Sequence, residues 1–175
     1  MKRLAAIFAT LLPLALLAAA FLYLRPAPTP SVRPIAGMVD RIVVEKSARR
    51  MTLCQDGTEV RAYRIALGFS PEGDKFEQGD GRTPEGIFRI NRRNDQSAYH
   101  LSLGLDYPQS QHRARAKAAG VSPGGDIMIH GQPNTLPESV VLNTDWTAGC
   151  IAVSNAEIRE IWQVTGPETL VEIRP

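Results

Sequence analysis

The chain has 175 residues and a formal net charge of +2, with 20 Lys and Arg against 18 Asp and Glu. These charges are scattered and form no basic stripe interleaved with aromatic residues, which argues against nucleic-acid binding. The 13 prolines and 14 glycines indicate many turns and short strands rather than a helical bundle. The length suffices for one domain with a sizeable core.

The N-terminus carries a long apolar run. Lys2 and Arg3 precede the uncharged residues 4–24, which would span about 31 Å as a helix, roughly the thickness of a bilayer core. A secretory signal usually has a shorter apolar region and a small-residue cleavage site. We therefore expect residues 1–24 to be an uncleaved signal-anchor, with a cleaved signal peptide as the alternative. The two basic residues would stay in the cytoplasm and direct the rest of the chain across the membrane.

A proline-rich linker, residues 25–38, follows this run and is expected to be stiff and extended. The remaining residues, 39–175, are expected to form one domain. β-favouring and alternating segments predict strands at 41–46, 51–55, 60–67, 87–90, 99–105, 127–129 and 170–173. Residues 68–81 form a loop of a length that is uncommon unless it is functional or mobile.

Two helices are expected. The first covers residues 109–119, whose basic side chains are interpreted as a solvated face. The second follows a capping box at Ser154 and Glu157, with Ile158, Ile161 and Trp162 as its buried stripe. The predicted fold is therefore mainly β with one or two helices.

The chemistry-bearing residues are a histidine and a cysteine. His130 ends the apolar run 127–129 and precedes Gly131, while Cys150 ends the turn Thr147-Ala148-Gly149-Cys150. A neighbouring imidazole can take the proton of a thiol and lower its pKa, which makes the sulfur nucleophilic. Backbone N–H groups at Ala148 and Gly149, together with a helix expected directly after the cysteine, would favour negative charge there.

Plainer interpretations remain open. Cys54 is interpreted as a small buried apolar side chain, and a Cys54–Cys150 disulfide is the alternative in an oxidising compartment. Arg82 could meet a substrate carboxylate or form an ion pair within its loop. Trp146 could pack over the cysteine turn or form a pocket wall. The three histidines and two cysteines fit no short zinc-ligand spacing, so no metal site is expected.

From about residue 39 to residue 173 the chain resembles the L,D-transpeptidase catalytic domain, or YkuD, family. Three segments carry the resemblance: Gly79-Asp80-Gly81-Arg82-Thr83-Pro84-Glu85-Gly86-Ile87-Phe88, Ile129-His130-Gly131 and Thr147-Ala148-Gly149-Cys150-Ile151. The chain has Ala148 and Ala152 where well-known members have His and Arg. Its Gly-Cys-Ile-Ala-Val sequence is similar to the YafK-like branch, some members of which are hydrolases that release a lipoprotein from the wall.

The resemblance implies a β-sandwich of mixed sheets and an enzyme of the periplasm or cell envelope that needs no cofactor. Cys150 would attack a peptidoglycan stem tetrapeptide, His130 would act as base, and the Gly131 carbonyl would orient His130. Thr147 would hold the turn or contact the substrate. The expected reaction is L,D-transpeptidation by a monomer. The alternatives are hydrolysis at the same site, as a carboxypeptidase or an amidase acting on a wall-attached lipoprotein, and a non-catalytic wall-binding module.

Overall fold

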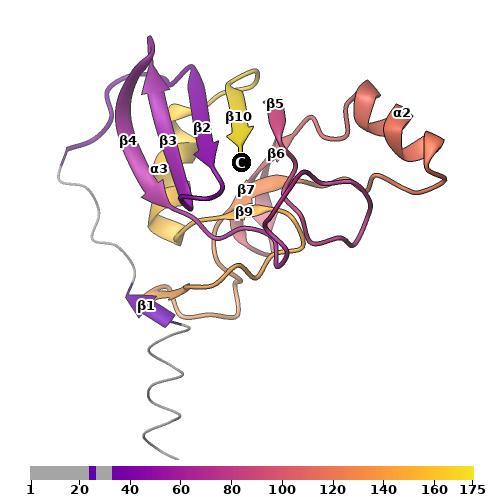
Figure 1. Cartoon of the computed structure of the whole chain (residues 1–175). Coiled ribbons are helices and arrows are strands. Elements are labelled where there is room, and N and C mark those ends of the chain that lie inside the picture. The colour runs from indigo at the N-terminus through magenta and orange to yellow at the C-terminus, as the bar shows by residue number, and fades with distance from the viewer. Residues whose placement is uncertain (1–23, 27–32) are drawn as a thin grey trace, which may run out of the picture.

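The structure is a computed structural model of the whole chain, in which residues 24–26 and 33–175 are described. Ten strands and two helices lie within these residues (Figure 1). The strands are β1 (Leu24–Pro26), β2 (Arg41–Glu45), β3 (Arg50–Gln55), β4 (Thr58–Arg64), β5 (Gly86–Ser97), β6 (His100–Leu105), β7 (Met128–His130), β8 (Val140–Leu142), β9 (Ile151–Ala152) and β10 (Leu170–Arg174). The helices are α2 (Ser110–Ala118) and α3 (Asn155–Val164).

Eight of the strands form one mixed sheet in the order β4-β3-β2-β10-β5-β6-β7-β9. β10 runs parallel to β2 and β9 runs parallel to β7, whereas the other neighbours are antiparallel. The prediction of a mainly β fold with mixed strand directions and two helices is confirmed.

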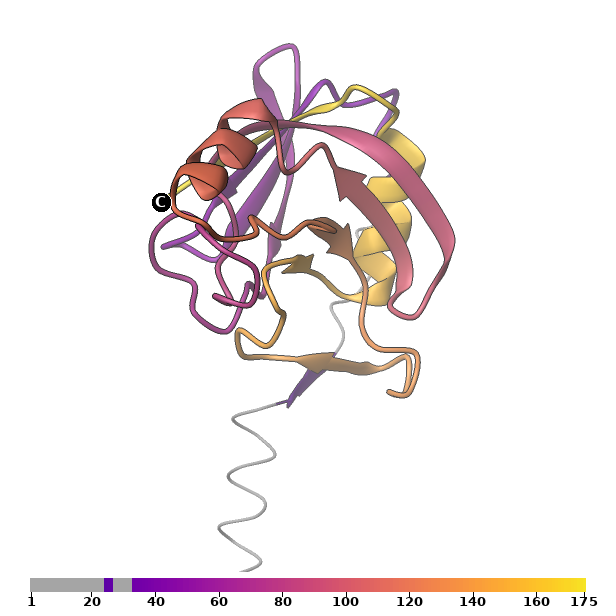
Figure 2. The same ribbon diagram turned by 90° about the vertical axis from the view of Figure 1, so that its right-hand side faces the viewer.

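The sheet curls so that its two edges meet. Directly after β4, Ala66 exchanges two backbone hydrogen bonds with Ala152 of β9, at 2.9 and 2.8 Å. The chain continues beside the cysteine turn, where Phe69 N–H donates to the carbonyl of Thr147 at 2.9 Å. The core therefore lies between two facing halves of one curled sheet, with α2 and α3 on different sides of the molecule (Figure 2).

Alternation of buried and exposed side chains explains the strands, and helical spacing explains α3. In β2, Ile42 and Val44 are fully buried between more exposed neighbours, as expected for a strand with one face on the core. In α3, the buried apolar residues are Ile158, Ile161 and Val164. Trp162 packs against the core as expected but is only partly buried, and the Arg93 guanidinium lies 3.9 Å from its ring centroid.

Several boundaries differ from the prediction. β5 extends to Ser97, well past residue 90, because its polar second half pairs with β6 in a bulged hairpin. β8 and β9 were not predicted, since segments of three and two residues show no periodicity. At the junction of the expected signal-anchor and linker, β1 pairs antiparallel with β8, which gives this extended backbone a partner strand.

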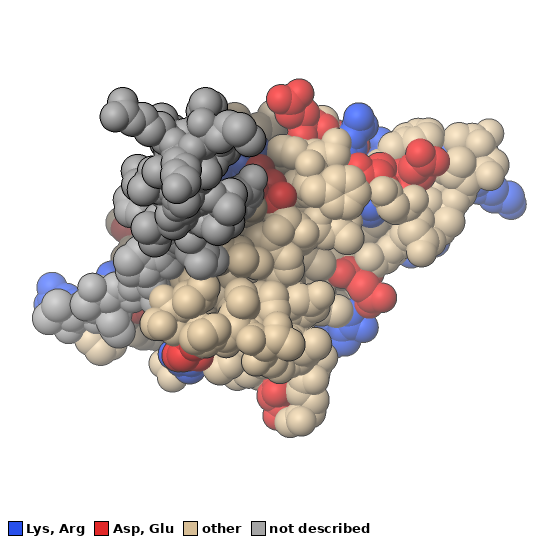
Figure 3. All heavy atoms as spheres, turned by 90° about the horizontal axis from the view of Figure 1, so that it is seen from below, with Lys and Arg blue, Asp and Glu red and all other residues tan. Residues whose placement is uncertain are grey.

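No helix within residues 24–26 and 33–175 combines the length and apolar character needed to cross a membrane. The expected signal-anchor falls on residues 1–24, and all but the last of these lie outside the described part of the chain. On the face seen in Figure 3, basic and acidic side chains are interspersed, in keeping with the small net charge.

Replacing Ser154 with Ala should lower the free energy of unfolding by about 1–2 kcal/mol. The buried Ser154 hydroxyl accepts from Glu157 N–H at 3.2 Å, and Glu157 Oε2 accepts from Ser154 N–H at 2.7 Å, so both bonds of the predicted capping box are present. Chemical denaturation measures the change. Ser110→Ala, at an exposed serine that begins α2, is the matched control and should change stability by less than about 0.5 kcal/mol. Equal effects of the two substitutions would contradict the capping role.

Candidate active site

His130 is held rigidly at the end of β7. This strand lies between β6 and β9, and His130 is 3% exposed. Its Nδ1 lies 2.7 Å from the carbonyl oxygen of Gly131, which can only accept a hydrogen bond. The proton of the neutral ring therefore sits on Nδ1, and Nε2 carries the lone pair.

Two aromatic rings enclose this imidazole. The ring centroid of Tyr99 lies 4.7 Å from that of His130, and the ring centroid of Trp146 lies 5.6 Å from it. Burial lowers the pKa of His130, and the hydrogen bond to Gly131 only partly opposes this effect. At neutral pH the ring is therefore neutral and able to accept a proton.

The cysteine turn is fixed by one hydroxyl and one glycine. Thr147 Oγ1 donates to the carbonyl of Cys150 at 2.8 Å and accepts from Gly149 N–H at 3.1 Å. Gly149 has φ +133°, and a Cβ at this position would lie 2.6 Å from the carbonyl oxygen of Arg82. Only glycine fits this position, and its N–H is already used within the turn. The prediction that Gly149 offers a free oxyanion donor is therefore wrong in this geometry.

The Cys150 thiol is hydrogen-bonded to backbone groups. Sγ donates to the carbonyl oxygen of Asp126 at 3.3 Å, and the Met128 N–H donates to the sulfur. No hydrogen bond joins the Cys150 and His130 side chains in the described part of the chain. Burial raises the pKa of Cys150, and the bond from Met128 lowers it by less. The expected low thiol pKa is therefore not found in this resting arrangement.

The helix expected directly after the cysteine begins later. Ile151 and Ala152 form β9, which pairs with β7, and α3 starts only at Asn155. Helix-terminal stabilisation falls off within the first turn, so α3 contributes little to the electrostatics of the sulfur.

Cys150 and His130 line one cavity of about 480 Å³. It is also lined by Asn94, Ser97, Ala98, Tyr99, Ser102, Asp126, Met128, Trp146, Thr147 and Ala148. Trp146 thus forms part of the cavity wall. Sequence reasoning missed Tyr99, Ser102 and Asp126 as cavity residues. The signal for Ser102 is its pairing directly opposite His130, and this becomes visible only once β6 and β7 are aligned.

Arg82 is not among the residues that line this cavity. Its guanidinium donates to the carbonyl of Asp74 at 3.4 Å, while its own carbonyl packs under Gly149. The segment 68–82 therefore packs against the cysteine turn through Phe69 at its start and Arg82 at its end. Asp80 orders this loop by accepting hydrogen bonds from Lys75 Nζ and from three backbone N–H groups, which outweigh the effect of burial and lower its pKa to about 2.

The remaining candidates have separate partners. Cys54 and Cys150 are both free thiols, so the alternative of a disulfide is not seen. His100 Nε2 lies 2.9 Å from Arg159 Nη1, whereas His112 packs against the rings of Phe88 and Tyr107. No three His, Cys, Asp or Glu side chains in residues 24–26 and 33–175 come close enough to hold a metal ion.

Thr147→Val, which removes the hydroxyl and keeps the shape, should lower the free energy of unfolding by about 1–3 kcal/mol. The buried Gly149 N–H and the Cys150 carbonyl would both lose their partner. The matched control is Thr144→Val, at an exposed position three residues earlier. If thermal or chemical unfolding gave the same stability for both variants, the hydroxyl would not hold the turn.

The raised thiol pKa gives a pH prediction. In a Cys54→Ser background, alkylation of Cys150 by iodoacetamide should accelerate about tenfold per pH unit from acid through the ordinary thiol range, because only the thiolate reacts. Rates followed by mass spectrometry of the intact protein measure this. A rate that is already at its plateau between about pH 5 and 7 would mean a preformed thiolate and would contradict the resting arrangement.

Known proteins resemble this chain in sequence. The family model described as the L,D-transpeptidase catalytic domain, YkuD, matches residues 39–173. YafK of Escherichia coli (strain K12), a candidate L,D-transpeptidase, is 29% identical over 123 residues, which cover 65% of this chain and 43% of YafK. The chain thus spans less than half the length of this relative.

Solved structures share the fold. The helical cell shape determining protein Pgp2 from Campylobacter jejuni superposes with a TM-score of 0.60 and 26% identity, over 79% of this chain and 48% of that one. An L,D-transpeptidase from Xylanimonas cellulosilytica gives a TM-score of 0.51 at 18% identity, over 86% and 64% of the two chains. The match of the family model over most of the sequence is decisive: the chain belongs to the L,D-transpeptidase catalytic domain (YkuD) family.

Proposed function

We propose that this chain is a cysteine-dependent L,D-transpeptidase that acts on peptidoglycan stem tetrapeptides through a thioester at Cys150. The observation that carries the proposal is the shared cavity. A half-buried thiol and a neutral histidine line the same space of about 480 Å³; the Nδ1 of this histidine is hydrogen-bonded to a carbonyl, and its Nε2 has no hydrogen-bond partner among the described residues. This combination is what acyl transfer by a cysteine requires.

In the first step, Sγ leaves the Asp126 carbonyl and gives its proton to Nε2 of His130. The thiolate attacks the carbonyl carbon of the third residue of the stem, a diaminopimelate in the resemblance. The tetrahedral intermediate collapses, and the terminal D-Ala leaves as an amine with the proton from His130. The product is a thioester on Cys150.

The oxyanion of this intermediate needs N–H donors. Gly149 N–H is engaged, whereas the N–H groups of Ala148 and Cys150 donate to no other group in the described residues. These two amides are therefore the proposed oxyanion donors. One such donor is typically worth about 3–4 kcal/mol of transition-state stabilisation.

The acceptor decides the reaction. An amine of a second stem would give a new amide and a cross-link, whereas water would give a carboxylate and a shortened or released stem. The small, exposed side chain of Ala148 stands at the cavity where well-known relatives have a histidine. An open rim of this kind admits either nucleophile, so hydrolysis at the same site is the second candidate, including release of a wall-attached lipoprotein. Either reaction places the protein in the periplasm or cell envelope, and membrane anchoring through residues 1–24 belongs to the same proposal.

The test is incubation of the full-length chain with purified tetrapeptide muropeptides, followed by mass spectrometry of the products. Cross-linked dimers with loss of D-Ala support transfer, and tripeptides support hydrolysis. Cys150→Ala should abolish either product, and His130→Gln should slow it by about 10²–10⁴-fold, since a general base is lost. Thr144→Val is the control and should retain the wild-type rate. Product formation by Cys150→Ala, or binding of muropeptides with no turnover by the wild type, would overturn the proposal, and the second outcome would favour the wall-binding module.

A further inference from the structure

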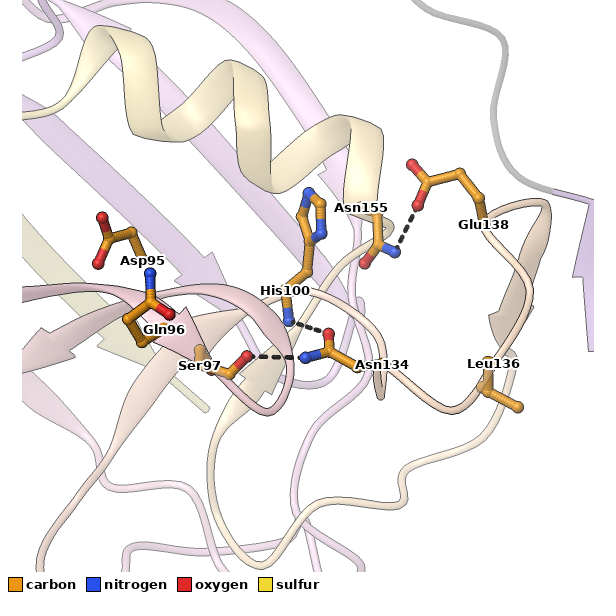
Figure 4. Close-up of a pocket in the computed structure, with 8 residues that line it drawn as sticks. All are labelled: Asp95, Gln96, Ser97, His100, Asn134, Leu136, Glu138 and Asn155. Atoms are coloured by element: carbon orange, nitrogen blue, oxygen red, sulfur yellow. Dashed lines mark hydrogen bonds between the residues drawn. The ribbon is translucent and has the colours of Figure 1, made fainter.

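A polar wall lies behind the proposed active site, on the far side of Gly131. It borders a second cavity of about 460 Å³, lined by Asp95, Gln96, Ser97, His100, Asn134, Leu136, Glu138 and Asn155 (Figure 4). Ser97 lines both cavities, so the tip of the β5–β6 hairpin separates them. In Figure 4 the side chains of Asn155, at the start of α3, and Glu138 point toward one another.

A continuous hydrogen-bonded chain runs from this wall to the histidine. His130 Nδ1 donates to the Gly131 carbonyl at 2.7 Å. The same peptide group continues with the N–H of Gln132, which donates to Asn155 Oδ1 at 2.8 Å. Asn155 Nδ2 then donates to Glu138 Oε2 at 2.9 Å. Every donor in this chain points the same way, from the imidazole to the carboxylate.

The aligned direction has an electrostatic consequence. Hydrogen bonds in series polarise one another, so a bond to an anion at one end strengthens the acceptor at the other. The hydrogen bond from Asn155 lowers the pKa of Glu138, with a further contribution from Arg159, so Glu138 is an anion at neutral pH. Its charge therefore favours a proton on His130 Nδ1, as a carboxylate does in a catalytic triad, but through two intervening amides.

We propose that Asn155 and Glu138 are positioning residues, which hold His130 as the Nδ1–H tautomer through the Gly131–Gln132 peptide group. As a contribution to catalysis this rests on the proposed function. As a statement about the tautomer of His130 it stands independently of that function.

The packing around Gly131 leaves the Gly131–Gln132 peptide group little room to move. A Cβ on Gly131 would lie 2.6 Å from Asn155 Oδ1 and 3.0 Å from His100 Cβ. Its N–H is shared between the carbonyls of Tyr99 and Leu101, at 3.0 and 3.2 Å. The peptide group is thus held on its N-terminal side by β6 and on its C-terminal side by Asn155.

The charged groups at both ends of this hydrogen-bonded chain determine how the pKa of His130 should respond to a change at Glu138. At the outer end, Glu138 Oε1 accepts from Arg159 Nη2 at 2.7 Å, and Arg159 Nη1 lies 2.9 Å from His100 Nε2. At the inner end, the titratable groups that share the cavity of His130 are Tyr99, Asp126 and Cys150. Neutralising Glu138 leaves the inner groups unchanged, so a shift in the His130 pKa would report the relay.

The experiment is ¹⁵N NMR of the histidine rings in the full-length protein, together with steady-state turnover of muropeptides. Glu138→Gln keeps the size of the side chain and an acceptor for Asn155. It should lower the pKa of His130 and reduce kcat about 3-fold with little change in KM, because a bond to a charged acceptor is exchanged for a neutral one. Asn155→Ala should populate the Nε2–H tautomer and reduce kcat by about 10-fold, the lower end of what outer partners of functional histidines contribute.

Asp95→Asn is the matched control, because it neutralises a carboxylate of the same cavity that is not part of the chain. It should leave the tautomer, the pKa of His130 and the turnover unchanged. If Asn155→Ala fails to fold, the Glu138→Gln variant alone tests the inference. A folded Glu138→Gln variant with the wild-type His130 pKa would overturn the inference. If the pKa of His130 shifts in Glu138→Gln but the wild type turns over no muropeptide, the relay is supported and the proposed function is contradicted.

Discussion

The parallel pairing of β7 with β9 is the constraint on which the candidate active site depends. His130 and Cys150 are separated by a crossover of about twenty residues, and only the alignment of Ile129 with Ile151 and of His130 with Ala152 brings their strands together. β9 has two residues and could not hold this register alone. The contacts of Ala66 with Ala152, and of Leu67 and Phe69 with Thr147, fix it from the other edge of the sheet. The curl of the whole sheet is therefore what brings the thiol and the imidazole to the same cavity.

Many of the strands and helices, and the two chemistry-bearing residues, could be predicted from the sequence. The alternating segments gave most of the strands, and the capping box placed the start of α3 correctly, because both signals are local. The Gly-Cys turn and the His-Gly pair identified the two chemistry-bearing residues, Cys150 and His130, among those that line the cavity.

The rest depends on contacts between distant segments. β8 and β9 are too short to show a period, and Ser102 enters the cavity only through its pairing with His130. The two interpretations of Arg82 could not be separated from the sequence, because its contacts with the Asp74 carbonyl and with Gly149 come from segments apart from it in the chain. The thiol pKa was misjudged for a related reason. Proximity of a histidine implies an ion pair only when the two groups share a hydrogen bond, and Sγ instead donates to Asp126.

The contact between Cys150 and Asp126 has a consequence for the resistance of the sulfur to oxidation. Peroxides and disulfides react with thiolates far faster than with thiols. A sulfur that is kept protonated, half-buried and bonded to a backbone carbonyl resists oxidation to sulfenic acid and mixed disulfides while no substrate is bound. Under the proposed function, the thiolate would form only when a substrate fills the cavity, so the resting sulfur would stay chemically stable until it is needed for the reaction.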